Sequence, residues 1–311
     1  MTRTVVVTGA TSGIGRAAAR EFAGRGDRLV LAARSSETLA EVRRECADAG
    51  AAEVRTVPTD VTEPGALDAL AAEVDRIDVW VHTAAVMAYG RFEEIPAEVF
   101  DQVVRTDLLG SAGVARVALR HFKETGAGTL ILTGSVLGHI TAPYMSGYVT
   151  SKWGLQGLAR ALQQESRDLP GVNVCLVTPG SVDTPVYQQA ANYVGRIGRP
   201  PLPITTPERV ARAIAHCADR PRREISVGPV NLLMRVGFTA LPAVYDVLVG
   251  PLMRLGGLTG RPVPPTEGVV FAPNPAGEAT RGGWLPDVSR AVRSAVGATA
   301  AAGSAMRRRL G

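Results

Sequence analysis

Lysine is nearly absent from this chain. Only Lys123 and Lys152 are lysines among its 34 lysines and arginines. Where a protein uses arginine almost everywhere, a lysine marks a place at which a compact, rotatable point charge serves better than a planar guanidinium fork. The scarcity therefore directs attention to the surroundings of the two lysines.

Cysteine and histidine are also scarce. The three cysteines, Cys46, Cys175 and Cys217, lack metal-ligand spacing, and the four histidines form no paired motif with them. We therefore expect no metal site, and we expect buried free thiols in a protein that works in a reducing compartment.

Aromatic residues make up only 5% of the chain, and its arginines are scattered although the net charge is +5. A basic patch interleaved with stacking residues is missing, so nucleic-acid binding is not indicated. No charge-free apolar run approaches the ~20 residues that a transmembrane helix needs. The first residues, MTRTVVVTGA, enter a strand pattern at once and leave no room for a signal segment, which predicts a cytoplasmic protein.

The second lysine lies in the most informative stretch of the sequence. Tyr148 and Lys152 are four residues apart, so a helix would present both on one face. Ser135 follows an apolar run, residues 129–133, that predicts a buried strand. The three side chains can therefore meet at the carboxyl end of that strand. An isolated pair with this spacing would more simply be a surface tyrosine and lysine.

The Ser, Tyr and Lys trio suits proton donation to a carbonyl oxygen while a hydride reaches the carbon. A free tyrosine, with a pKa near ~10, is a poor acid-base group at neutral pH. A nearby cation favours its ionised form, so we expect Lys152 to lower the pKa of Tyr148.

A glycine-rich turn follows the first apolar run. Residues 3–8 predict a buried strand, residues 8–15 read TGATSGIG, and a helix-forming stretch comes next. Strand, turn and helix in this order form the first half of a dinucleotide-binding unit. The glycines would let the backbone approach a pyrophosphate, whose charge the amino end of the helix meets. A purely structural turn is the alternative, and the position directly after the first strand weighs against it.

Arg34 ends the second predicted strand, residues 28–33, and Ser35 or Ser36 would cap the helix after it. In dinucleotide-binding folds an acidic residue at this position accepts a hydrogen bond from the ribose 2′-hydroxyl, whereas an arginine accommodates a 2′-phosphate. Arg34 therefore favours NADP(H), with Thr11 and Ser12 as hydroxyl donors. A solvated arginine at a helix start is the simpler alternative.

The rest of the first 228 residues alternates between strand and helix patterns. This alternation predicts an α/β fold with a doubly wound parallel sheet of six or seven strands. Residues 185–205 are rich in proline and glycine and predict a loop, which would either cover a cleft or lie loose on the surface. The expected strands are residues 53–57, 77–82, 129–133, 172–177 and 224–228, and the expected helices are residues 63–76, 96–123 with a bend near Gly110, 148–168 and 207–219.

The sequence resembles the short-chain dehydrogenase/reductase family over about residues 3 to 228. The motifs that carry the resemblance are TGATSGIG at 8–15, Asp60-Val61, Ser135, Tyr148-Val-Thr-Ser-Lys152 and the Pro179-Gly180 loop ending in Thr184. Their joint order and spacing are specific to that family.

The resemblance implies a Rossmann fold, a nicotinamide cofactor and a catalytic Ser135, Tyr148 and Lys152. It places Asp60 and Val61 at the adenine and Thr184 at the nicotinamide carboxamide, and gives Lys152 the nicotinamide ribose hydroxyls. It also suggests a homo-oligomer. The expected cofactor-binding residues are Gly9, Thr11, Ser12, Gly13, Ile14, Gly15, Arg34, Asp60, Val61, Thr83, Ala84, Tyr148, Lys152, Pro179, Gly180 and Thr184.

Two places depart from the family pattern. His82-Thr83-Ala84-Ala85 stands where the family commonly has Asn-Asn-Ala-Gly, and alanine tolerates positive φ less well than glycine. Asp107 stands at the catalytic-tetrad asparagine. A carboxylate there would stabilise the Lys152 ammonium and compete with the tyrosine phenolate for it. The family's asparagine serves a water relay through its main-chain carbonyl, which an aspartate can also supply.

The resemblance to the common family core ends after residue 228. We therefore expect a Rossmann catalytic domain at 1–228 and a helical and loop extension at 229–311. Residues 259–286, dense in proline and glycine, predict an extended wrap or linker. Residues 287–310 are an alanine-rich helix candidate.

The apolar stretch 229–257 holds too many large side chains to stay solvated. Its proline residues Pro242 and Pro251 should divide it into short helices. It would pack on the substrate cleft, a partner subunit, the core or a membrane surface. Arg235 and Arg254 at its edges, with the arginines at 307–309, suit peripheral membrane contact.

These observations favour an NADPH-dependent carbonyl reductase, or the reverse alcohol dehydrogenase, acting on a lipophilic small molecule. Ser135 would hydrogen-bond the substrate oxygen, Tyr148 would act as general acid, and Lys152 would tune Tyr148 and hold the cofactor. The alternative, motivated by Asp107 and the 82–85 turn, is an NADP(H)-binding scaffold or redox-responsive interaction protein with little turnover.

Overall fold

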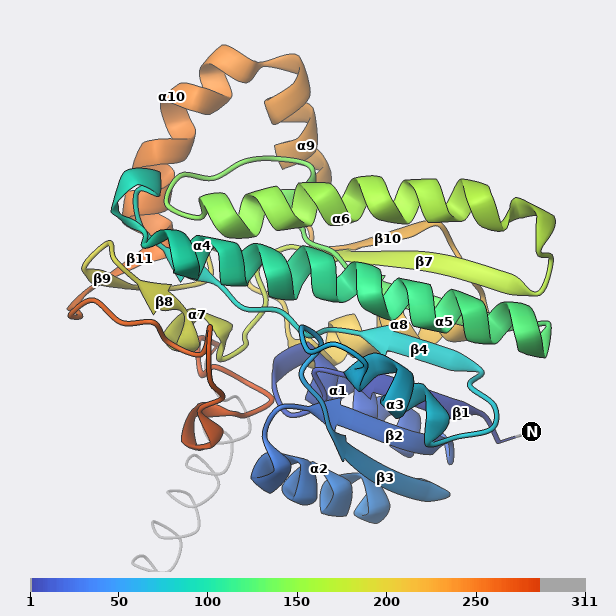
Figure 1. Cartoon of the computed structure of the whole chain (residues 1–311). Helices are drawn as coiled ribbons and strands as arrows, with labels where there is room; N and C mark the ends of the chain where they lie inside the picture. Colours follow the sequence, from blue (N-terminus) through green and yellow to red (C-terminus); the bar gives the residue numbers. More distant parts are fainter. Residues whose placement is uncertain (1, 286–311) are drawn as a thin grey trace, which may run out of the picture.

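The computed structural model describes residues 2–285, so the helix candidate at 287–310 and the arginines at 307–309 lie outside the described residues. A seven-stranded sheet runs through the centre, with every pair of neighbouring strands parallel (Figure 1). The predicted doubly wound parallel sheet is confirmed. In spatial order the strands are β10 (Glu224–Val227), β7 (Val172–Pro179), β6 (Gly128–Thr133), β4 (Val79–His82), β1 (Thr4–Thr8), β2 (Arg28–Ala33) and β3 (Glu53–Pro58).

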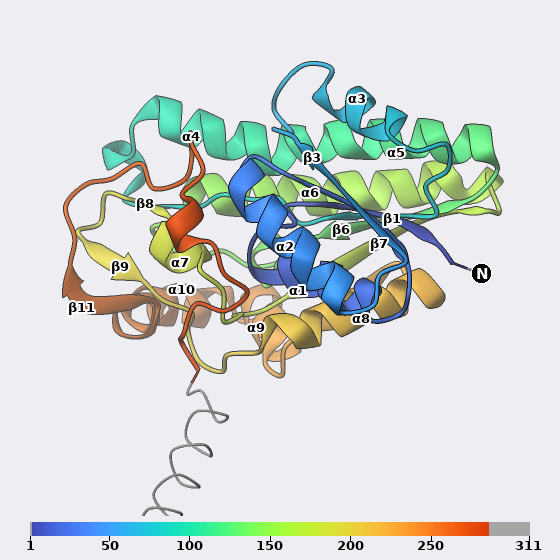
Figure 2. The same cartoon turned by 90° about the horizontal axis from the view of Figure 1, so that it is seen from below.

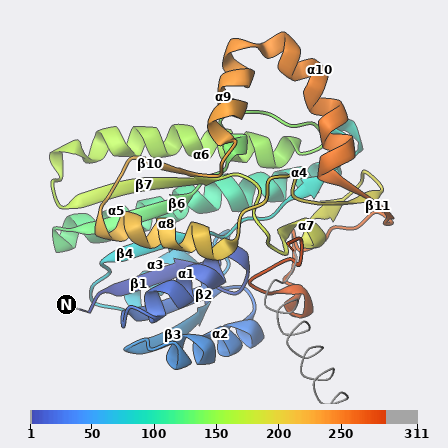
Figure 3. The same cartoon turned by 180° about the vertical axis from the view of Figure 1, so that it is seen from behind.

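Helices cover both faces of the sheet (Figures 2 and 3). Because helices cover both faces, the side chains of the central strands are apolar on both sides of the sheet. They are buried in two core clusters, one on each side. The strands therefore form a rigid platform whose carboxyl ends meet at one edge. One face carries α1 (Gly13–Ala23), α2 (Ser36–Asp48) and α8 (Pro207–Asp219), and the other carries α3 (Ala66–Ala72), α5 (Ser111–Thr125) and α6 (Ser146–Glu165).

The helix cap predicted at Ser35 or Ser36 is formed by Ser35, and α8 has a cap of the same kind. The Ser35 hydroxyl accepts the Thr38 N–H at 3.2 Å and starts α2. Thr206 caps α8 in the same way, by accepting the Arg209 N–H at 3.3 Å, and Pro207 follows at the first helical position. Each hydroxyl satisfies a backbone donor that the first helical turn leaves unpaired.

The long helical stretch before β6 is interrupted, as the expected bend near Gly110 indicated. The helix α4 (Ala97–Val104) passes through a π-helical turn, Arg105–Gly110, into α5. A π turn inserts an extra residue into the helix and is frequent at functional sites. Here it contains Asp107 and turns this residue into the core, where it is fully buried.

The prediction of a loop over residues 185–205 was wrong in part. This stretch contains a short helix, α7 (Val186–Gln189), and two short strands, β8 (Ala191–Asn192) and β9 (Arg196–Gly198). The strand β8 pairs with β5 (Ala88–Tyr89), and β9 pairs with β11 (Leu258–Pro262). Strands of two or three residues are too short to show a hydrophobic periodicity, and their pairing partners are distant in the sequence.

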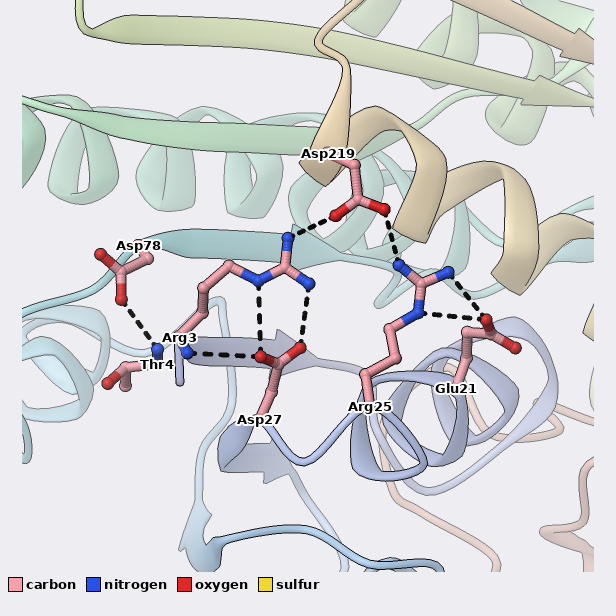
Figure 4. A network of polar contacts seen from close by, with 7 residues as sticks. All are labelled: Arg3, Thr4, Glu21, Arg25, Asp27, Asp78 and Asp219. Atoms are coloured by element: carbon pink, nitrogen blue, oxygen red, sulfur yellow. Dashed lines mark hydrogen bonds and ion pairs between the residues drawn. The ribbon is translucent and has the colours of Figure 1, made fainter. Parts of the chain in front are cut away.

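An ion-pair network closes the amino ends of the strands (Figure 4). Arg3 donates to Asp219 at 2.7 Å and to Asp27 at 3.1 Å, and Arg25 donates to the second Asp219 oxygen at 2.8 Å. The Thr4 N–H at the start of β1 is accepted by Asp78 at 2.9 Å. The network joins α8 to the first βα unit at the end of the sheet opposite the site described below.

The apolar stretch after β10 forms a helical hairpin that stands away from the sheet at its carboxyl edge (Figures 1 and 3). It consists of α9 (Asn231–Ala240) and α10 (Pro242–Leu252). Pro242 separates the two helices, as predicted, because it opens α10 at a position that needs no N–H. Pro251 does not end α10; the chain continues through its last turn into a π-helical turn, Met253–Gly257.

Polar side chains anchor the hairpin to the sheet. The buried Asn231 amide donates to the Thr178 carbonyl at 3.2 Å and to the Ser226 hydroxyl at 3.0 Å. Arg235 donates to Glu224 at 2.9 Å, and the Tyr245 hydroxyl donates to the Thr141 carbonyl at 2.7 Å. The hairpin is therefore held at its base and on the side that faces the segment before α6.

Residues 267–284, called the strap below, return along α7 toward α1 and α2 (Figure 2, red). The wrap or linker predicted for residues 259–286 begins with part of β11 (Leu258–Pro262), and beyond it the strap has no helix or strand apart from one 3₁₀ turn, Pro275–Gly277. It is held by backbone hydrogen bonds, such as Val269 N–H to the Gln189 carbonyl at 2.9 Å, and by side-chain hydrogen bonds, many of which end on strap carbonyls.

Candidate active site

A large cavity of about 1070 Å³ opens at the carboxyl edge of the sheet. Its walls include the glycine-rich turn after β1, the ends of β2, β4, β6 and β7, the hairpin and the strap. The carboxyl edge of a doubly wound sheet is where ligands bind in such folds. All the expected cofactor-binding residues and Ser135 line this cavity.

The expected catalytic trio is brought together as the sequence predicted. Ser135 follows β6 directly, and its hydroxyl accepts the Leu137 N–H at 3.1 Å, which fixes the turn. Tyr148 and Lys152 lie one turn apart on α6, with the Lys152 nitrogen 5.2 Å from the centre of the tyrosine ring. All three line the cavity.

Lys152 is buried, and its ammonium has two neighbours. It donates to the Thr133 carbonyl at the end of β6 at 3.3 Å and lies 3.7 Å from the Asp107 carboxylate. Burial lowers the pKa of Lys152, and the Asp107 carboxylate opposes this by stabilising the charged form. The predicted pairing of Asp107 with Lys152 is confirmed.

Lys152 was expected to lower the pKa of Tyr148, but the net shift of this pKa in the structure is upward. Burial raises the pKa of Tyr148, the Asp107 charge raises it further, and only the hydrogen bond with Ser135 lowers it. Burial is the largest of these effects, and the Asp107 carboxylate, 3.7 Å from the Lys152 nitrogen, adds to it by offsetting the ammonium at the phenol.

Asp107 itself is held from three sides. One carboxylate oxygen accepts the Val86 N–H at 2.8 Å, and its main-chain carbonyl accepts the Ser111 hydroxyl at 2.6 Å. The other carboxylate oxygen has no hydrogen-bond partner among the described residues and points to Lys152. Burial raises the pKa of Asp107 to about 6, against the lowering effect of Lys152.

A buried hydrogen-bond chain supports this arrangement. His82 contacts the Thr8 hydroxyl at 2.8 Å through Nδ1 and the Ser111 hydroxyl at 2.9 Å through Nε2. Because Ser111 gives its proton to the Asp107 carbonyl, Nε2 must be the protonated nitrogen and Nδ1 accepts from Thr8. Burial lowers the pKa of His82 to about 3, so the ring stays neutral. The chain therefore fixes the main-chain carbonyl of Asp107 through the Ser111 hydroxyl.

The unusual 82–85 turn needs no strained backbone. Tyr144 is the sole non-glycine residue with a positive φ among residues 2–285. Thr83 fixes the turn by donating its N–H and its hydroxyl to the Thr8 carbonyl, at 2.9 Å and 2.8 Å. The concern about alanine in place of glycine at this turn therefore does not apply.

The glycine-rich turn has the shape that a dinucleotide requires. Gly9 has a φ of +82°, and a Cβ there would lie 2.6 Å from the Ala84 nitrogen. A side chain at Gly15 would collide with the Gly9 carbonyl. Because Gly9 and Gly15 have no side chains, the turns after β1 and β4 can pack together and leave the cavity open above them. The backbone and hydroxyl donors of the turn at the start of α1 fit an anionic cofactor.

The remaining expected cofactor residues surround this turn. Asp60 and Val61 follow β3, while Thr184 ends the loop after β7 and is buried against Gly13. The fold and the site together define a nucleotide-dependent oxidoreductase of the doubly wound α/β class. The residues that line the cavity in this part are Thr83, Ala84, Asp60, Val61, Pro179, Gly180 and Thr184.

Comparison with known proteins identifies the family. Residues 3–193 match the model of the short chain dehydrogenase family, and this chain belongs to that family. It is 30% identical over 293 residues to an uncharacterized oxidoreductase, YxnA, of Bacillus subtilis (strain 168), covering 90% of this chain and 82% of YxnA. A D-beta-hydroxybutyrate dehydrogenase of Rhizobium meliloti (strain 1021) is 31% identical over 260 residues, covering 77% of this chain and 100% of the relative.

Among solved structures, an alcohol dehydrogenase from Thermococcus sibiricus complexed with 5-hydroxy-NADP is similar. Its TM-score is 0.63 at 28% identity, over 73% of this chain and 96% of that chain. The match with YxnA covers more of this chain than residues 1–228 do, so it includes part of the extension. Within residues 2–285, no helix is long and apolar enough to cross a membrane.

The contacts between the strap and the expected cofactor-binding residues could not be predicted from the sequence. Thr11, Ser12 and Gly13, expected to face a cofactor, are hydrogen-bonded to Glu278 and Ala279 of the strap. Arg34 donates to the carbonyls of Val269 and Val270. Carbonyl contacts of an irregular segment leave no signal in residue type, so the sequence indicated a wrap but not its position.

We predict that Asp107→Asn shifts alcohol oxidation to lower pH. Removing the buried negative charge removes a cause that raises the pKa of Tyr148, and oxidation needs the phenolate as base. Because the pKa of Asp107 is about 6, the two proteins should differ above about pH 6 and converge below it, where Asp107 is protonated. The measurement is kcat/KM for oxidation as a function of pH.

Asp101→Asn, on the exposed side of α4, is the matched control for this change and should leave the profile in place. A profile of Asp107→Asn that coincides with that of the original protein would show that the carboxylate does not act on Tyr148. Asp107 would then serve the site through its main-chain carbonyl alone.

Proposed function

We propose that the protein is an NADP(H)-dependent carbonyl reductase, acting in reverse as an alcohol dehydrogenase, with a lipophilic small-molecule substrate. The observation that carries the proposal is one cavity in which Ser135, Tyr148 and Lys152 lie next to the apolar inner face of the hairpin. The family membership supports the reaction class, and the residues of this chain support the cofactor form and the substrate type.

In the reduction, bound NADPH would supply a hydride to the carbonyl carbon. Ser135 would hold the carbonyl oxygen by donating its hydroxyl proton, and Tyr148 would give its phenolic proton to that oxygen as the alcohol forms. Lys152 would stabilise the resulting phenolate and hold the ribose hydroxyls. A water whose hydrogen bond the Asp107 carbonyl accepts would deliver a proton to Lys152 as Lys152 gives one to the phenolate, which restores Tyr148.

Arg34 supports the NADP(H) form. Its guanidinium lies half-buried at the end of β2 on the cavity wall, where the adenine ribose binds in this class of fold. Asp60 and Glu278 lie near enough to favour its charged form. A 2′-phosphate is a partner of the charge and geometry that such a guanidinium suits.

The hairpin supports a lipophilic substrate. Its large apolar residues divide into two sets, of which one lines the cavity and the other lies outside the lining. The inner set is Leu233, Leu241, Val244, Leu248 and Leu252, and the outer set is Leu232, Val236 and Val247; both sets are more than half exposed in the structure. We infer that residues 229–285 form an extension that completes the substrate site of the 1–228 domain.

The scaffold alternative rests on Asp107, whose charge opposes ionisation of Tyr148. The intact trio and the cavity weigh against it. A cytoplasmic homo-oligomer, with the outer set of the hairpin in contact with a membrane, completes the proposal. A screen of NADPH oxidation over ketones, aldehydes and quinones tests it, and a folded, NADPH-binding protein that fails across the panel would favour the scaffold.

We predict that Tyr148→Phe keeps the fold and the cofactor affinity but lowers kcat about 10²- to 10⁴-fold, because only the proton donor is removed. The measurement is turnover of the best substrate of the screen, with cofactor affinity taken from NADPH fluorescence. Tyr193→Phe, which removes a phenolic hydroxyl outside the cavity lining, is the control. An unchanged rate for Tyr148→Phe would assign the acid to another group.

We predict that NADPH binds more tightly than NADH, and that Arg34→Asp removes this preference. Charge-assisted hydrogen bonds to a phosphate correspond to about a tenfold to hundredfold difference in affinity. Titration of both cofactors measures the ratio, with Arg44→Asp on the exposed side of α2 as control. Equal affinities for the two cofactors in the original protein would contradict the NADP(H) assignment.

We predict that Leu248→Glu raises KM for apolar substrates about tenfold or more, because a carboxylate replaces an apolar contact on the inner face of α10. Its neighbour Val247 is 72% exposed and lies outside the cavity lining, so Val247→Glu is the matched control. Equal KM values would show that the hairpin does not contact substrate. Liposome sedimentation of the two variants tests the membrane contact, which Val247→Glu alone should weaken.

A further inference from the structure

The strap occupies the hydrogen-bond donors at the start of α1. The Gly13 N–H donates to the Ala279 carbonyl at 2.9 Å, and the Ser12 hydroxyl donates to the same carbonyl at 3.1 Å. The Thr11 hydroxyl donates to one oxygen of the Glu278 carboxylate at 3.0 Å. The strap thus places a carbonyl and a carboxylate against the end of a helix that attracts negative charge.

A second set of strap contacts holds Arg34. Its guanidinium donates to the Val269 carbonyl at 2.7 Å and to the Val270 carbonyl at 3.3 Å. Burial lowers the pKa of Arg34, and the charges of Asp60 and Glu278 oppose the shift. The strap therefore satisfies, with its own oxygens, the group proposed to receive the 2′-phosphate.

The strap is fixed beyond these contacts by its carboxyl-terminal part. The Trp284 N–H donates to the Asp183 carboxylate at 2.8 Å, and the Trp284 ring donates to the Thr184 carbonyl at 3.3 Å. Arg281 donates to Glu208 at 3.0 Å. The strap spans the cavity from the Arg34 side to the Thr184 side, which is the length of the expected dinucleotide site.

We propose that the strap is an intramolecular competitor of the dinucleotide, and that cofactor binding opens it. The Ala279 carbonyl and the Glu278 carboxylate hold donors that a cofactor phosphate or ribose would otherwise take. A backbone N–H or a hydroxyl donates one hydrogen bond, so the same group cannot serve both partners fully. Glu278 stands in for the negative charge of the cofactor.

Charge strengthens the competition. The second Glu278 oxygen is buried and has no hydrogen-bond partner among the described residues. A carboxylate in this position repels a pyrophosphate placed at the same helix end, so the closed strap and the bound dinucleotide exclude each other. The observed association constant is then the intrinsic association constant multiplied by the fraction of molecules with an open strap. This proposal rests on the proposed function only in taking the ligand to be a nicotinamide dinucleotide.

Hydrogen–deuterium exchange of the full chain tests the opening directly. If NADPH displaces the strap, the backbone amides of residues 267–284 should exchange faster in the complex, while those of the central strands stay protected. Slower exchange of the strap in the complex would overturn the proposal, because it would show a lid that closes over the cofactor.

Glu278→Ala and Glu278→Gln test the competition by affinity. Loss of the charged contact should tighten binding about tenfold for Glu278→Ala and less for Glu278→Gln, because a larger fraction of molecules has an open strap. Glu267→Gln, an exposed carboxylate of the same strap, is the control and should leave the affinity in place. Unchanged or weaker binding by Glu278→Ala would overturn the proposal.

Comparison of the two cofactors separates this proposal from the function proposed above. The strap must open for either cofactor, so Glu278→Ala should improve the affinities for NADPH and NADH by the same factor and leave their ratio unchanged. Arg34→Asp should change their ratio, in addition to any effect of removing its two strap contacts. If Glu278→Ala has no effect while NADPH still binds and is oxidised, the strap proposal fails alone. If no variant binds either dinucleotide, the proposed function fails as well.

Discussion

A buried ammonium must have an electrostatic partner, and the interior of this site is arranged around that of Lys152. The strand β6 supplies the Thr133 carbonyl, and the π-helical turn brings the Asp107 carboxylate within 3.7 Å. The chain from Thr8 through His82 and Ser111 then fixes the Asp107 carbonyl. Two of the family's asparagine positions are thus replaced together, and a neutral histidine and a paired carboxylate form one connected arrangement.

The fold could be predicted because its signals are local. β-Branched runs mark the strands, Ser35 and Thr206 mark helix starts, and the spacing of Tyr148 and Lys152 places both on one face of α6. Asp107 was found from its position in the family motif. The direction of the tyrosine pKa shift could not be found in this way, because it depends on the burial of the phenol and on the separation of two charges.

The extension shows where sequence reasoning ends. Pro242 predicted the division of the apolar stretch into two helices. Which of their apolar residues line the cavity could be determined only from the structure. The strap has no periodicity and binds through carbonyls, which every residue has. Long-range contacts of this kind depend on tertiary packing and not on residue type.

The hairpin, β11 and the strap are consecutive along one chain, and β11 is clamped to β9 between the other two. Residues 263–266 alone connect the clamped strand to the strap. These connecting residues are themselves held, because the Val263 N–H donates to the Gly195 carbonyl at 3.2 Å and Thr266 exchanges two backbone hydrogen bonds with Asn192. A strap that opens as proposed can therefore move without displacing the hairpin, since a paired segment lies between the two.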